Sequence, residues 1–182
     1  MQIKLQTKNP YGLAILIGLS TFILYLTTWH MGFGGYEQET ATSAIKLLDG
    51  DFLVRRAGIF ASALYVPFIL FFKLIGLDSA VWLSIVPVVF SALIIMGIFY
   101  IVWYLTDKKY IALAVSMFVA LGSIVWPYAN IGMEYQTTFL ITILLITLLR
   151  WKKGIGSLLS VGIAFSLLVA TKSYGIVFGL PV

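Results

Sequence analysis

The chain has 182 residues, of which 61% are hydrophobic and only 10% are charged. Soluble domains are about half apolar and about a quarter charged, so this composition excludes an ordinary soluble globule and is typical of a protein in a lipid bilayer. The net charge is +5, but no basic stripe interleaved with aromatic residues occurs, which argues against nucleic-acid binding. The absence of cysteine excludes disulfides, thiolate metal sites and cysteine nucleophiles.

Six apolar stretches follow one another along the chain. They are Tyr11 to Trp29, Ala57 to Leu77, Ser79 to Thr106, Tyr110 to Trp126, Tyr135 to Leu149 and Ile155 to Thr171. A membrane-spanning helix needs about 20 predominantly apolar residues, so most of these stretches are long enough. The first is longer than the core of a signal peptide and lacks a small-x-small cleavage site, so we expect it to remain as an anchor. The sequence predicts an all-α, polytopic transmembrane helix bundle.

The positions of Lys and Arg indicate which stretches cross. If all six cross and the N-terminus is cytoplasmic, most basic residues lie outside, against the tendency of Lys and Arg to stay cytoplasmic. If Ala57 to Leu77 lies on the outer side as an interfacial or re-entrant helix, most of them lie inside. Pro67 and Lys73 within this stretch favour that placement. Six crossings with an outside N-terminus would also satisfy the count, so that alternative stays open.

We therefore expect about five crossings within a single transmembrane domain, residues 1–182, and a long first outer loop, residues 30–78. The amphipathic stretch Thr42 to Leu53, interrupted by Gly50, predicts a juxtamembrane helix in this loop. Every acidic residue except Asp107 falls on the outer side in this layout. Acidic residues contribute little to topology, so their gathering on one side needs another explanation.

Three of these acids are candidates for chemistry. Glu37 and Glu39 follow the first apolar stretch closely, after a turn that Gly34 and Gly35 allow. A carboxylate at a partly desolvated boundary can act as a general base, although a solvated acidic loop explains the same residues more simply. Glu134 precedes another apolar stretch, where it either favours the helix dipole or binds a sugar hydroxyl, a cation or an acceptor.

Three cations lie on the same predicted side. Arg55 and Arg56 precede the second apolar stretch, and Lys172 follows the last one. Each alone is typical of a headgroup contact or a helix-end anchor. Together with the acids they suggest a site for a phosphate-bearing lipid beside a carboxylate that activates its reaction partner. His30 is the only histidine, so no metal site is predicted.

Several short motifs occur in a fixed order. They are the acid after the first span, Ala44-x-x-Leu47-Leu48-x-Gly50, Tyr65-x-Pro67, Ile75-Gly76-Leu77-Asp78-Ser79, Tyr128 to Glu134 and Ala170-Thr171-Lys172. This order resembles the N-terminal half of the GT-C membrane glycosyltransferases, above all the dolichyl-phosphate-mannose protein mannosyltransferases and the bacterial aminoarabinose transferases. Because such proteins usually have more spans, the resemblance implies an N-terminal fragment that lacks a C-terminal remainder and is inactive alone.

The resemblance implies an enzyme of the plasma membrane that moves a sugar from a polyprenyl-phosphate donor to a hydroxyl of a protein, lipid or glycan acceptor. The reaction would take place on the extracytoplasmic face. Such families keep an acid pair, often Asp-Glu, after the first span; here Tyr36 occupies the Asp position and Glu37 the Glu position. Glu37 is then the base and Glu39 its reserve. The substrate-binding candidates are Glu134, Lys172, Arg55, Arg56 and Tyr36. No cofactor is implied with certainty, and a divalent cation stays open.

Two other classes of function remain. A multi-pass lipid or solute transporter would need polar residues or helix breaks midway through its spans, and Pro87 is the one candidate break in Ser79 to Thr106. A non-catalytic membrane subunit would explain the composition but would leave the one-sided acids without a role.

Overall fold

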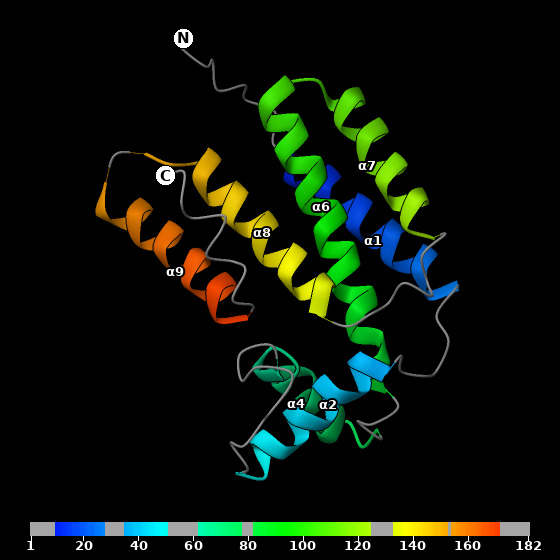
Figure 1. Cartoon of the computed structure of the whole chain (residues 1–182). Helices are drawn as coiled ribbons and strands as arrows, with labels where there is room; N and C mark the ends of the chain where they lie inside the picture. Colours follow the sequence, from blue (N-terminus) through cyan, green and yellow to red (C-terminus); the bar gives the residue numbers. More distant parts are fainter. Residues whose placement is uncertain are drawn as a thin grey trace.

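A computed structural model describes residues 10–27, 35–50, 62–77, 82–124, 133–152 and 154–171, and it is helical without strands in these ranges (Figure 1). The side chains of residues 35–40, 123–124 and 133–134 are not described. The helices are α1 (Tyr11–Thr27), α2 (Gly35–Leu48), α4 (Val66–Leu74), the 3-10 turn η1 (Leu83–Ile85), α6 (Val86–Thr106), α7 (Lys109–Ile124), α8 (Met133–Leu149) and α9 (Ile155–Thr171). The all-α prediction is confirmed for the described residues.

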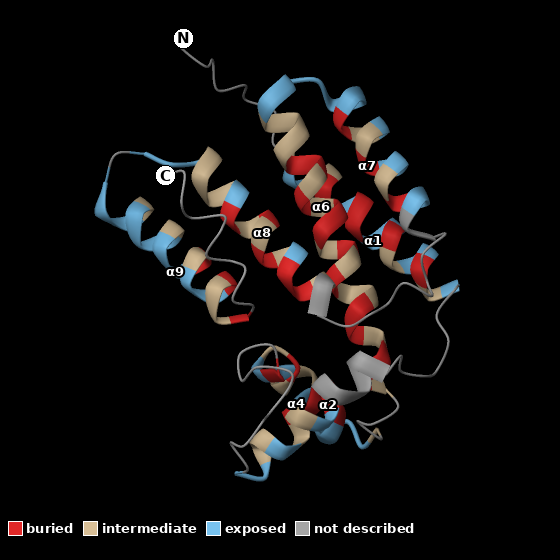
Figure 2. Cartoon of the chain, in the orientation of Figure 1, coloured by how far each residue is buried: buried red, intermediate tan, exposed pale blue. Residues whose placement is uncertain are grey.

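Helix α6 is the centre of the bundle. It packs against α1, α7 and α8, and α9 packs on the far side of α8 (Figure 1). Because neighbours surround it, α6 is buried along much of its length, including Ile95 and Phe99 (Figure 2). Pro87 lies in its first turn, where the missing backbone N–H has no intrahelical partner to lose. The interpretation of Pro87 as a break midway through a span is therefore wrong.

Close helix contacts join the neighbours of α6. Gly97 of α6 faces Thr142 of α8, and a Cβ atom at Gly97 would collide with Thr142 Cγ2. Small residues let helix backbones approach in this way, which increases the packing contacts between them. On the other side, the Tyr25 hydroxyl of α1 donates a hydrogen bond of 2.9 Å to the backbone carbonyl of Ala120 in α7.

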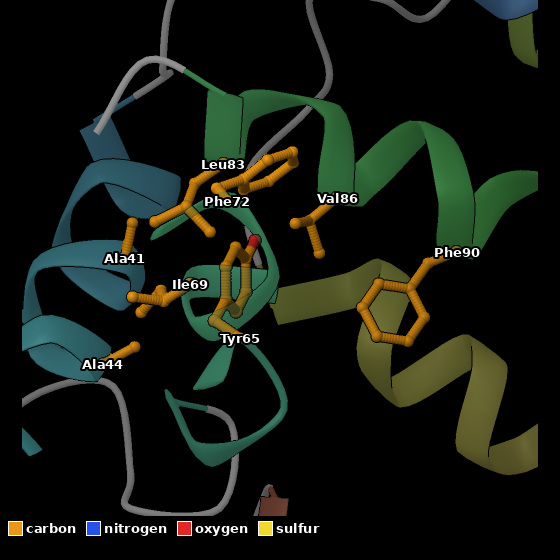
Figure 3. Close-up of a cluster of buried hydrophobic side chains, with 8 residues drawn as sticks. All are labelled: Ala41, Ala44, Tyr65, Ile69, Phe72, Leu83, Val86 and Phe90. Carbon is orange, nitrogen blue, oxygen red and sulfur yellow. The ribbon is translucent and has the colours of Figure 1, made fainter. Parts of the chain in front are cut away.

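Helices α2 and α4 pack together at one end of the bundle, beside the start of α6 (Figure 1). Buried side chains of α2, of α4 with its N-cap, of η1 and of the start of α6 form a hydrophobic cluster. It is here called the end cluster, and Figure 3 shows it. It consists of Ala41, Ala44, Tyr65, Ile69, Phe72, Leu83, Val86 and Phe90. On α2 the apolar spacing is helical, and exposed Lys46 occupies the outer face. The prediction of an amphipathic helix over Thr42 to Leu53 is confirmed for residues 42–48, and residues 51–53 lie outside the described residues.

The bounds of α2 correct one prediction. The helix begins at Gly35, so Glu37 and Glu39 lie in its first turns and not in a solvated loop beyond a glycine turn. Acidic residues near a helix N-terminus interact favourably with the helix dipole, and Glu and Gln are good helix formers. The helix ends at Leu48, and Gly50 follows with a left-handed φ of 83°.

Helix α4 is short. It has 9 residues, which corresponds to a length of about 13 Å, whereas the hydrocarbon core of a bilayer is about 30 Å thick. Gly76 ends it with a φ of 73°, and the Leu77 backbone N–H returns to the Phe72 carbonyl at 3.0 Å. Within the described part of Ala57 to Leu77, this helix is thus too short to cross a bilayer. Residues 57–61 lie outside the described residues.

Of the described helices, one segment is long and apolar enough to cross a membrane. This segment is Leu83–Thr106, with 24 residues. Core helices of soluble proteins share that length and composition. The apolar helices α1, α7, α8 and α9 are shorter, so the predicted five crossings are not confirmed.

Candidate functional site

Segments far apart in the sequence meet at the end of the bundle that carries α2 and α4. Helix α2 contacts α4 and also α8. Tyr135 and Phe139 of α8 pack against the end cluster, and the Phe139 ring lies 5.2 Å from that of Phe90, which Figure 3 shows beside α8. Helix α2 and the first turns of α8, which together include the three candidate acids, therefore contact the same cluster.

The register of α2 distinguishes its two acids. Glu37 precedes the buried residues Ala41 and Ala44 by four and seven positions. Residues at this spacing share one face of a helix, so Glu37 occupies the register of the face that packs on the end cluster. Glu39 is two positions further along and falls on the opposite side of the helix. Tyr36 also lies in the first turn of α2, away from that register.

The first turns of α8 combine a candidate acid with a buried amide. Glu134 is the second residue of the helix. Gln136 is 0% exposed, and neither its Oε1 nor its Nε2 atom has a hydrogen-bond partner among the described residues. An unsatisfied buried polar group costs about 1–3 kcal/mol, so such a group calls for an explanation such as a bound water or a ligand.

A second buried polar group lies in the helical residues 62–63, before the turn that leads into α4. The hydroxyl of Ser62 is buried and has no partner within the described part of the chain. Two residues later, Leu64 packs both against the end cluster and against the cluster around Leu140 of α8. Leu64, two residues after Ser62, therefore joins the end cluster to the cluster that α8 and α9 form together.

Sequence reasoning missed both of these polar residues. Gln136 had a usable signal, because it is the only amide in the apolar stretch Tyr135 to Leu149. Ser62 had none, since a small hydroxyl residue in an apolar stretch usually satisfies itself on the backbone of its own helix.

The three predicted cations, Arg55, Arg56 and Lys172, lie outside the described residues. Lys172 follows Thr171, the last residue of α9, whose hydroxyl donates a hydrogen bond of 2.8 Å to the Leu167 carbonyl. That end of α9 points toward the end of the bundle with α2 and α4 (Figure 1).

The described basic residues of the two short connections lie at the opposite end. Lys108 and Lys109 lie at the junction of α6 and α7, and Arg150 and Lys152 lie between α8 and α9 (Figure 1). These four cations and the helix starts that carry the candidate acids therefore lie at opposite ends of the bundle. Within the described ranges, no three His, Cys, Asp or Glu side chains are grouped so as to hold a metal ion.

Comparison of the chain with protein-family models, with curated proteins and with solved structures finds no match. The resemblance of the sequence motifs to GT-C transferases therefore stays a hypothesis, and the placement of the residues is what bears on function.

Proposed function

We propose that this chain is a single-domain part of a polytopic membrane glycosyltransferase. It would transfer a sugar from a polyprenyl-phosphate donor to a hydroxyl of a protein, lipid or glycan acceptor. The observation that carries the proposal is the contact between α2, which includes Glu37, and α8, whose first turns include Glu134 and the buried amide of Gln136. The site lies at one end of a largely apolar helix bundle, where a lipid-linked donor and a water-soluble acceptor can both reach it.

The orientation follows from the basic residues. Lys and Arg of short connections are retained in the cytoplasm, so the end with Lys108, Lys109, Arg150 and Lys152 is the inner one. The end with α2 and α4 then faces the extracytoplasmic side of the plasma membrane. Helices α1, α6, α7, α8 and α9 would make the five crossings. The four shorter ones have 16 or 17 residues each, at the lower limit of about 17 for a spanning helix.

In the proposed reaction Glu37 takes the proton from the acceptor hydroxyl while that oxygen attacks the anomeric carbon of the sugar. The bond between this carbon and the phosphate oxygen breaks, and the electron pair leaves with the polyprenyl phosphate. A phosphate is a good leaving group, so it needs nearby cations for charge stabilisation and no proton donor. Arg55, Arg56 and Lys172 are the candidates for that role.

The transporter class receives less support. Alternating-access transporters commonly use helices that are broken near the membrane midplane. Across the described ranges the helices of the bundle run without a break, and positive φ angles occur only at Gly50, Gly76 and Asp107, all beyond helix ends. A non-catalytic membrane subunit remains the alternative that an activity assay tests directly.

The test compares Glu37→Gln with Glu39→Gln in membranes that contain a full-length version of the protein and polyprenyl-phosphate donors with a labelled sugar. We expect Glu37→Gln to reduce transfer by at least about 100-fold, the lower range for general-base catalysis, and to leave donor binding unchanged. Glu39→Gln should retain most of the activity, because its register lies away from the end cluster. Equal losses in the two variants would remove Glu37 as the base, and no transfer from any donor by the unaltered full-length protein would favour the subunit.

A further inference from the structure

We propose that the groove between α8 and α9 binds an anionic glycerophospholipid. One of its acyl chains would lie in the groove, and its phosphate would lie beside Arg150 and Lys152. The inference rests on the membrane location in the proposed function, and it concerns the end of the bundle opposite to the candidate site.

The groove has the volume of a ligand pocket and an apolar lining that suits one acyl chain. Its volume is about 600 Å³, and both helices contribute apolar walls, among them Leu144 and Leu148 from α8 and Leu159 and Phe165 from α9. This volume lies within the range of about 300–1,000 Å³ that is usual for ligand pockets. Gly162 lies on its wall, and a Cβ atom there would meet nothing within 4 Å.

Helix α9 leaves an apolar surface without a protein neighbour among the described helices. It packs chiefly against α8, and its outward side chains are exposed, with Leu158 at 57% and Ile163 at 61% (Figure 2). A contiguous apolar surface of this kind marks an interaction site. Acyl chains are apolar like this surface, and they can also occupy the groove.

The positive charge at one end of the groove favours an anionic headgroup. Trp151 lines the groove and is 44% exposed, and exposed Arg150 and Lys152 flank it in the connection between α8 and α9. Tryptophan is enriched at the membrane interface, and a guanidinium group matches a phosphate with two parallel hydrogen bonds. Among the described side chains, neither Arg150 nor Lys152 forms an ion pair.

The connection is also held in place next to the groove. The Lys152 backbone N–H donates a hydrogen bond of 3.1 Å to Ser157 Oγ in the first turn of α9.

A second copy of the chain is a poorer occupant of the groove than a lipid. Two copies have the same orientation in a membrane, so pairing through this face would bring their basic connections together.

The test uses the full chain in phosphatidylcholine vesicles that contain a minority of phosphatidylglycerol. Either lipid carries a photoactivatable group in its acyl chain, and the labelled peptides are mapped by mass spectrometry. We expect phosphatidylglycerol to label α8 and α9 more strongly than phosphatidylcholine does. The double variant Arg150→Gln/Lys152→Gln should lower this labelling roughly tenfold, since each cation near a membrane surface contributes appreciably to anionic lipid binding.

Two matched controls isolate the groove and its charge. Gly162→Leu fills the groove and should abolish the labelling. Gly156→Leu adds the same side chain on the same helix in open space outside the groove and should not. Both changes favour the helical state, so neither threatens folding. The double variant Lys108→Gln/Lys109→Gln removes two charges from the same end of the bundle and should leave the labelling unchanged.

Equal labelling by the two lipids, or equal effects of the two leucine variants, would overturn the inference, as would crosslinks between two copies at this face. Extraction of the membranes with alkaline carbonate separates this failure from that of the proposed function. A chain released by carbonate contradicts the membrane location and thus both proposals. A chain that is retained but shows no preference for phosphatidylglycerol contradicts the lipid site alone.

Discussion

At the residue scale, Gln136 differs from the buried threonines and serines that hydrogen-bond to their own helix. Thr21 and Ser116 donate hydrogen bonds of 2.8 Å and 2.7 Å to the carbonyls four residues earlier, so their helices satisfy them. The amide of Gln136 needs both a donor and an acceptor, and neither of its polar atoms has a partner among the described residues. A buried amide that is satisfied only by substrate or water is a costly feature for a purely structural residue.

We predict that Gln136→Leu separates stability from activity. Leucine has a similar volume and removes the unsatisfied amide, so the free energy of unfolding should stay the same or rise by about 1 kcal/mol. Sugar transfer should fall by about tenfold or more if the amide binds a substrate hydroxyl. Thermal unfolding in detergent and the transfer assay measure the two effects. Unchanged transfer, or a clear loss of stability, would assign Gln136 a structural role.

At the element scale, the contact between α6 and α8 depends on the absence of a side chain at Gly97. Thr142 is β-branched, and its hydroxyl donates a hydrogen bond of 2.8 Å to the Thr138 carbonyl, which fixes the methyl group against α6. Since α8 carries both Glu134 and Gln136, this contact also sets the position of the candidate site relative to the centre of the bundle.

Gly97→Ala should therefore reduce the free energy of unfolding by about 1–3 kcal/mol, as usual for overpacking a core. The matched control is Gly122→Ala in α7, where a Cβ atom meets nothing within 4 Å and alanine should stabilise the helix slightly. Adding Thr142→Ser removes the obstructing methyl group and should restore much of the loss. Thermal unfolding of the four proteins is the measurement, and a Gly97→Ala protein as stable as the Gly122→Ala protein would contradict the proposed contact.

At the scale of the whole molecule, the two ends of the bundle differ in charge and in structure. One end has short connections with Lys108 and Lys152, and the other has α2, α4 and the starts of α6 and α8 (Figure 1). This polarity is what the proposed function needs, because a lipid-linked donor reacts on one face of the membrane only.

The chain contains no cysteine, so single cysteines report the topology directly. Gln38→Cys and Lys73→Cys should react with an impermeant thiol reagent from outside, and Lys108→Cys and Lys152→Cys only from the cytoplasmic side. Accessibility labelling in sealed vesicles of both orientations measures this. Lys73 inside and Lys108 outside would mean that Ala57 to Leu77 crosses the membrane, which would favour the transporter.

The sequence by itself determined the all-helical fold and most helix bounds. Apolar runs, prolines in first turns and glycines at helix ends determine helix bounds through interactions between neighbouring residues. The two wrong predictions, a turn at Gly35 and a helix break at Pro87, also concern local structure, because each residue is compatible with the first turn of a helix. Only the tertiary structure placed Glu37 in the register of the buried face of α2 and left the Gln136 amide without a hydrogen-bond partner among the described residues. These properties depend on contacts between α2, α4, α6 and α8, and packing between distant segments leaves no periodic signal in any one of them.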